Sequence, residues 1–92
     1  PHDGSLQFLL YFSLGMAEYY RNAYSKSLSY FSELARAKSD RKLKKEYLRK
    51  AEEVCKKISS DLKEEKGPKA AREAGSLADR IRKCYDELKR SP

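Results

Sequence analysis

The side chains that could carry out catalysis are few and scattered along the chain. His2 is the one histidine and lies in the segment 1–5, which is expected to be a cloning remnant, so we expect no Ser-His-Asp set, and Cys55 and Cys84 stand far apart with no CxxC motif. The four glycines form no phosphate-binding loop. We expect the acidic pairs Glu52-Glu53 and Glu64-Glu65 to lie on solvated helix faces. The pattern predicts a protein that is not an enzyme, holds no metal and needs no cofactor.

Aromatic and basic side chains are better suited to binding another molecule. Two adjacent rings, Tyr19-Tyr20, form a candidate contact platform, and the segment 41–66 is rich in lysine and arginine. Aromatic rings supply contact area, while cations attract an acidic partner and set its orientation. The residues expected to contact a partner are Tyr19, Tyr20, Lys44, Lys45, Arg49 and Lys56.

Length and charge restrict the class of molecule further. The chain has 92 residues, of which 38% are charged, and a formal net charge of +7. This length suits one small domain. Residues 1–35 hold 2 basic and 3 acidic side chains, whereas residues 36–92 hold 19 and 11. Eight of the ten aromatic residues fall within the first 31. The first half is therefore expected to be the apolar part, and the second half a basic surface that favours acidic partners.

The helices that would position these residues follow from hydrophobic spacing. The first is expected over 5–21, with a buried face formed by Leu6, Leu9, Leu10, Leu14, Ala17 and Tyr20 or Arg21. Asn22 suits a turn, which predicts a second helix from about Tyr24 to Lys38. One continuous helix through Asn22 is the alternative, because neither Gly nor Pro forces a break there. The second stripe comprises Tyr24, Leu28, Phe31, Leu34 and Ala35.

Two longer helices are expected to follow. Ser39-Asp40 can cap a helix that begins at Arg41, and Gly67-Pro68 ends that helix and starts another. The stripe of the third helix comprises Leu43, Tyr47, Leu48, Ala51, Val54, Cys55, Ile58 and Leu62. The stripe of the fourth comprises Ala70, Ala74, Leu77 or Ala78, Ile81, Tyr85 and Leu88. The predicted fold is all-α, a single antiparallel bundle of about four helices over residues 6–90. Residues 1–5 have the composition of a cloning remnant.

The first two helices resemble a tetratricopeptide repeat. In that family an aromatic residue, a Leu-Gly pair and a later small residue followed by aromatics recur in a two-helix unit. The matching residues are Tyr11, Leu14, Gly15, Ala17, Tyr24, Leu28, Tyr30 and Phe31. Glu18, Ser27, Leu34 and Ser39 depart from the pattern, and no second copy follows. The resemblance implies two helices docked through a small-residue contact, and a surface that holds a peptide.

A second resemblance involves the third helix as well. Residues 24–31 together with 45–52 are similar to the microtubule-interacting and trafficking domain. That family implies a three-helix bundle that binds short acidic or apolar helices beside its last helix. The interval between the two motifs is shorter here, and the helix after Gly67-Pro68 is extra.

These patterns predict a protein–protein interaction module that binds an acidic or amphipathic peptide or helix through the aromatic hairpin and the basic helix. One alternative is a basic domain that binds nucleic acid or an anionic membrane, for which steep salt dependence is expected. Another is a structural or self-associating piece of a larger helical scaffold. The unpaired cysteines and the absence of a signal-like or membrane-spanning segment predict an intracellular location, cytoplasmic or nuclear.

Overall fold

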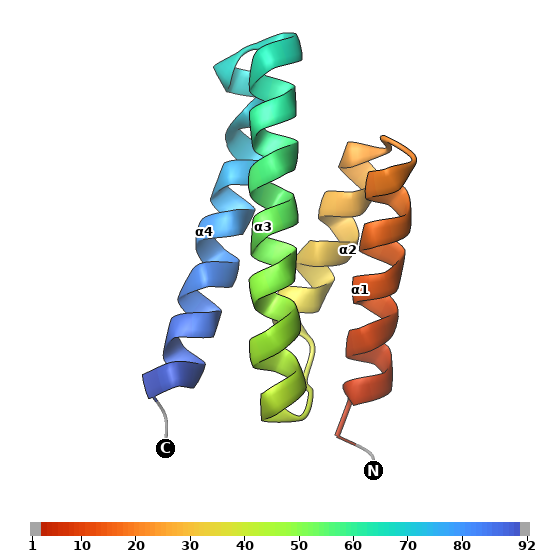
Figure 1. The fold of residues 1–92 in the computed structure, drawn as a ribbon, viewed down its shortest axis with the longest axis vertical. Coiled ribbons are helices and arrows are strands. Elements are labelled where there is room, and N and C mark those ends of the chain that lie inside the picture. Colours follow the sequence, from red (N-terminus) through yellow and green to blue (C-terminus); the bar gives the residue numbers. More distant parts are fainter. Residues whose placement is uncertain (1–2, 91–92) are drawn as a thin grey trace.

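The computed structural model describes residues 3–90 and consists of four helices, with no strand in that range (Figure 1). Helix α1 spans Ser5–Tyr20, α2 spans Tyr24–Arg36, α3 spans Arg41–Lys66 and α4 spans Pro68–Arg90. The prediction of an all-α bundle of four helices is confirmed. His2, the one histidine of the chain, lies outside the described residues, as does Pro1.

The break between the first two helices occurs at Asn22. Its φ of 62° is in the left-handed region, which asparagine tolerates better than most residues. The amide of Asn22 donates to the carbonyl of Tyr19 at 3.0 Å, and that of Ala23 donates to the carbonyl of Glu18 at 2.9 Å. This pair of bonds is a Schellman motif, which satisfies the last carbonyls of a helix and turns the chain. The two-helix interpretation is therefore right, and the continuous helix is excluded.

The other two connections also use the expected residues. The carboxylate of Asp40 accepts a hydrogen bond from the amide of Leu43 at 3.1 Å and so caps α3. Gly67, with a φ of 98°, ends α3, and Pro68 is the first residue of α4, where a missing N–H is harmless. The Ser5 hydroxyl accepts a hydrogen bond from the Asp40 amide at 2.9 Å, which ties the start of α1 to the start of α3.

The helices form two antiparallel hairpins of unequal length. The long α3–α4 hairpin makes up one side of the molecule, and the shorter α1–α2 hairpin packs against it (Figure 1). Helix α2 contacts both α3 and α4, whereas α1 lies at the outer edge and reaches only α2 and α3. The described part is flat, with extents of 42 × 26 × 15 Å. One long side of α1 therefore faces away from the rest of the bundle.

The core lies between the two hairpins and follows three of the four predicted stripes. The largest fully buried side chains, beginning with two phenylalanines, come from all four helices: Phe8, Phe31, Leu34, Leu48, Ile58 and Ile81. Cys55 is also fully buried, as expected of a cysteine that acts as a small hydrophobe, and Cys84 packs at the edge of the core.

Gly15 is where α1 and α2 come closest. A Cβ atom built on Gly15 would lie 2.6 Å from Cε1 of Phe31, so only glycine leaves room for the ring. Beside it, the buried hydroxyl of Ser27 donates to the carbonyl of Gly15 at 2.7 Å. The small-residue contact expected from the Leu14-Gly15 pair is thus present, and Ser27 adds a hydrogen bond to it.

The predicted buried face of the first helix is wrong for most of its residues, although Leu9 is partly buried against the core. Leu6 is 85% exposed, Leu10 54% and Tyr20 74%, and Ala17 is exposed as well. The opposite side of α1 faces the core, through Phe8 and Gly15 together with the partly buried Tyr11, Phe12 and Tyr19. Apolar residues recur at helical spacing on both sides of α1. The side with the phenylalanines and the glycine is the buried one because it fits against Phe31.

Candidate partner-binding site

An open groove of about 620 Å³ lies between the first half of α3 and the end of α4. Because the two helices are antiparallel, the beginning of α3 meets the last turns of α4. The guanidinium of Arg41 donates to the carbonyl of Leu88 and fixes the two ends together. We call this hollow the basic groove, and its lining residues are Asp40, Arg41, Lys42, Lys45, Glu46, Arg49, Lys50 and Tyr85.

Three cations of the basic groove have no partner among the described residues. Lys42, Lys45 and Arg49 follow one another at spacings of three and four, so they share one face of α3. The two acidic side chains nearby are already engaged, since Asp40 caps α3 and Glu46 pairs with Lys50 at 3.3 Å. Like charges at this spacing destabilise a helix by a few tenths of a kcal/mol per pair. A bound anion would remove that repulsion.

Tyr85 provides an aromatic surface in the same groove. The guanidinium of Arg82 lies 5.6 Å from the centre of its ring, and the ammonium of Lys89 lies 5.7 Å away. Both distances are within the range of a cation–π contact. Tyr85 is itself half-buried and packs against the core, so the ring is held in place. The groove therefore combines three cations that have no partner among the described residues with one aromatic ring that is held in place.

Glu52 and Lys56 lie farther along α3 and are bound to each other. The carboxylate of Glu52 is almost fully buried and forms ion pairs with Lys56 at 3.3 Å and with Arg82 of α4 at 3.7 Å. Glu52 was expected on a solvated face, and that expectation is wrong, because this position faces α4 and its charge is matched there. Its neighbour Glu53 is exposed as expected.

The predicted binding residues do not form one surface. Lys45 and Arg49 line the basic groove; Lys44 is half-buried on α3 outside the groove lining, and Lys56 is paired with Glu52. Sequence reasoning missed Lys42 and Tyr85. Lys42 stands three residues before Lys45, which is a visible signal, but the position of Tyr85 depends on the register between α3 and α4.

Tyr19 and Tyr20 lie at the other end of the molecule. The Tyr19 ring stacks on that of Tyr24 at 6.1 Å, and the Tyr24 hydroxyl donates to Asp61 at 2.7 Å. Asp61 is 16 residues beyond Lys45 on α3, a distance of about 24 Å along the helix. Tyr20 is mostly exposed. Tyr19 and Tyr20 therefore lie outside the lining of the basic groove.

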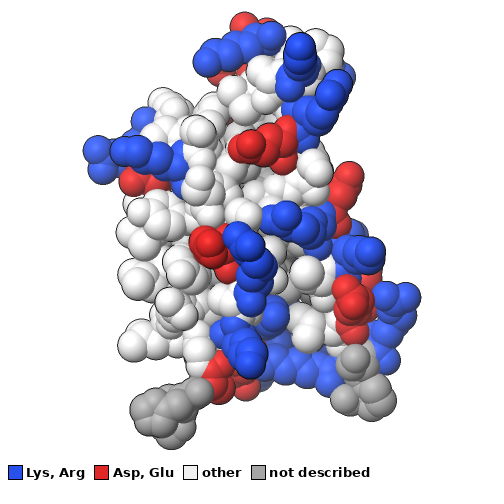
Figure 2. All heavy atoms as spheres, turned by 180° about the vertical axis from the view of Figure 1, so that it is seen from behind, with Lys and Arg blue, Asp and Glu red and all other residues white. Residues whose placement is uncertain are grey.

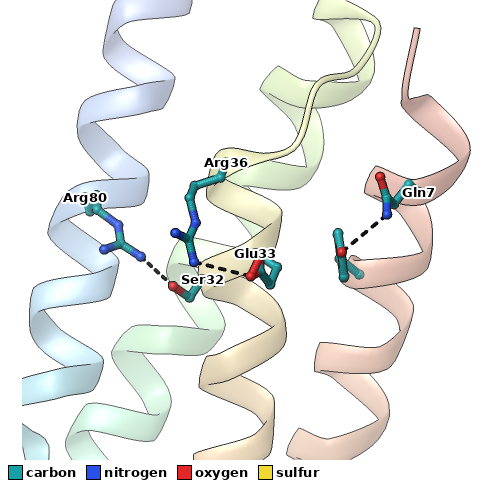
Figure 3. Close-up of polar contacts among 6 residues, drawn as sticks. Gln7, Ser32, Glu33, Arg36 and Arg80 are labelled. Carbon is teal, nitrogen blue, oxygen red and sulfur yellow. Dashed lines mark hydrogen bonds and ion pairs between the residues drawn. The ribbon is translucent and has the colours of Figure 1, made fainter. Parts of the chain in front are cut away.

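A second hollow, of about 830 Å³, lies between α2 and α4. Two of its four cations are engaged: Arg80 donates to the hydroxyl of Ser32 at 2.7 Å, and Arg36 pairs with Glu33 at 3.2 Å, whereas Lys69 and Arg72 have no partner among the described residues (Figure 3). Seen from behind, the α3–α4 side carries interspersed basic and acidic groups, whereas the side of α1 is largely uncharged (Figure 2). The α2–α4 hollow has only two cations without a partner among the described residues and no aromatic ring in its lining, so it is a weaker candidate than the basic groove.

The titratable groups with shifted pKa values indicate structural roles. Burial raises the pKa of the Cys55 thiol to about 12, and the nearby Glu52 carboxylate adds to the shift. The hydrogen bond to Asp61 raises the pKa of the Tyr24 phenol to about 12, with a contribution from burial. Cys55 therefore stays protonated at neutral pH and is a poor nucleophile. Within residues 3–90, no three His, Cys, Asp or Glu side chains gather as a metal site.

Comparison with known proteins adds no family. No model of a protein family, no curated protein and no solved structure matches this chain. Over the part of the chain that the structure describes, no helix is both long enough and apolar enough to cross a membrane.

Proposed function

We propose that this domain is a non-enzymatic interaction module that binds an acidic segment of a partner protein, as a peptide or a helix, in the basic groove. The observation that carries the proposal is the row of Lys42, Lys45 and Arg49, which has no partner among the described residues and stands beside the fixed ring of Tyr85. Carboxylates of the partner would pair with the cations, and an apolar side chain of the partner would contact the ring.

The dimensions and charges of the groove favour a short acidic segment over a nucleic acid strand. From Lys42 to Arg49 the row extends about 10 Å along α3, which matches the reach of a few carboxylates. Asp40 and Glu46 interrupt the cations of the same lining, so a segment with a few separate carboxylates suits the row better than a continuous chain of phosphates. The resemblance to two families that hold peptides or helices supports the same choice.

Binding of a labelled acidic peptide tests this proposal. The probe is a peptide of about 15 residues, long enough to form some helix alone, with glutamates placed every three or four positions between leucines. The control probe carries glutamine in place of every glutamate. We expect fluorescence anisotropy to show binding of the acidic peptide, and the double variant Lys45→Glu/Arg49→Glu to weaken it about tenfold or more, since two attractions become repulsions.

Lys69→Glu/Arg72→Glu is the matched control variant. It makes the same change of charge on α4, at exposed positions that line the α2–α4 hollow, so it leaves the basic groove intact. Equal loss of binding in both variants would indicate general charge attraction and contradict the proposal. Binding of a labelled single-stranded oligonucleotide but not of the peptide would assign the groove to nucleic acid instead. In that case the logarithm of the binding constant should fall linearly with the logarithm of salt concentration.

A further inference from the structure

The exposed large apolar side chains of the described residues all lie on one line of α1. They are Leu6, Leu10 and Tyr20. Ser13 and Ala17, both exposed, complete the line, which advances by four, three, four and three residues. This alternation is the spacing of the narrow seam along which two helices pack as a coiled coil. The bundle itself leaves that seam uncovered.

The flanks of this line are apolar as well. Leu9 and Met16 border it on one side and Leu14 on the other, each only partly buried. Glu18 is the one charged residue of α1. A helix that is apolar around its whole circumference is normally enclosed by protein. Here the bundle encloses only the side that contains Phe8 and Gly15.

We infer that this stripe, residues Leu6, Leu10, Ser13, Ala17 and Tyr20, is a self-association surface on which a second copy of this chain lays its own α1 in antiparallel orientation. The charge distribution carries the choice of a second copy. The molecule has a net charge of +7, so two copies repel each other through most faces, but the side of α1 is largely uncharged (Figure 2). The α1 contact keeps the basic α3–α4 hairpins on the outside of the pair.

The stripe also complements itself. A two-fold axis near Ser13, the middle position, brings Leu10 of one α1 opposite Ala17 of the other and Leu6 opposite Tyr20, so apolar residues meet along the whole stripe. Serine and alanine near the axis permit close approach of the two helices. Helix α1 is about 24 Å long and about 10 Å wide, a footprint well below the roughly 800 Å² per partner of a stable complex. The dimer is therefore expected to be weak and to depend on concentration.

Solution mass against concentration is the test. Sedimentation equilibrium of the wild-type chain, from low micromolar to millimolar, is expected to show a mass that rises from 10.7 kDa toward twice that value. Leu10→Glu and Leu6→Glu are expected to stay at the lower mass throughout, since each places a charge on the stripe. Both positions are exposed, so the fold is kept, which helical circular dichroism verifies. Gln7→Glu adds the same charge to an exposed position off the stripe and should still associate.

The orientation is tested by cross-linking. In a Cys84→Ser background, Ser13→Cys is expected to form a disulfide-linked dimer on oxidation, because the two-fold axis brings the same residue of both copies together. Gln7→Cys, which lies off the stripe, should not form a disulfide-linked dimer. Wild type at 10.7 kDa at every concentration, or Leu10→Glu associating as wild type does, would overturn the inference. If the wild type is monomeric and binds phosphatidylcholine vesicles through Leu10, the stripe is assigned to lipid. If dimers form but Ser13→Cys gives no cross-link, the antiparallel arrangement is excluded.

Discussion

Gly15 leaves the space into which the ring of Phe31 fits, and this contact sets how closely α1 and α2 dock. Position 75 offers a contrast, since a Cβ on Gly75 would lie 3.5 Å from the Ser59 hydroxyl, an ordinary contact. Both glycines stand inside helices, where each costs about 0.5–1 kcal/mol relative to alanine. Replacing them therefore separates helix preference from packing.

Gly15→Ala is expected to lower the free energy of unfolding by about 1–2 kcal/mol, because overpacking at Phe31 exceeds the gain in helix preference. Gly75→Ala is expected to raise it by about 0.5–1 kcal/mol. Urea unfolding followed by circular dichroism measures both. Equal stabilisation by the two substitutions would show that Phe31 moves aside at no cost.

The raised pKa of Tyr24 predicts that the free energy of unfolding falls at alkaline pH. Its pKa is raised from 10.0 to about 12 by the hydrogen bond to Asp61, so the folded state favours the neutral phenol. The stability that this group contributes is fully present below pH 10 and is lost as the pH rises through 12. The difference in unfolding free energy between wild type and Tyr24→Phe should therefore shrink across that window. A difference that stays constant from pH 9 upward would contradict the role of the bond.

At the scale of elements, caps and turns decided what was predictable. Asn22, Asp40 and the Gly67-Pro68 pair have local conformational preferences, so the ends of the helices could be read from the sequence to within about two residues. The buried side of α1 could not, because α1 is apolar on both sides and spacing alone does not choose between them. The choice depends on Phe31, which is contributed by another helix.

Asn22 gives the prediction at this scale. Asn22→Val is expected to destabilise the protein by about 1–2 kcal/mol, since a β-branched residue is strained at a φ of 62°. Asn22→Gly should be neutral or slightly stabilising, because glycine adopts this conformation freely. Thermal unfolding of the two variants in parallel is the measurement. Equal melting temperatures would mean that the turn relaxes to another conformation.

At the scale of the whole molecule, the uneven distribution of charge was visible in the sequence, but its consequences were not. The basic second half forms the α3–α4 hairpin, as expected. The basic groove itself needs Tyr85 to lie beside residues that are some 40 positions earlier in the chain, and that juxtaposition follows only from helix register. The same register turns Glu52 inward toward Arg82, whereas the packing of α1 places Tyr19 near Tyr24, away from the groove.

The Gly15–Phe31 contact has a consequence for recognising related chains. Any side chain at position 15 requires the phenyl ring at position 31 to shift, so we expect the two positions to change together in related chains. A relative with alanine at the first position should carry a shorter residue, such as leucine or valine, at the second. That coupled pair, sixteen residues apart, would identify this helical hairpin in chains too divergent for overall similarity to show it.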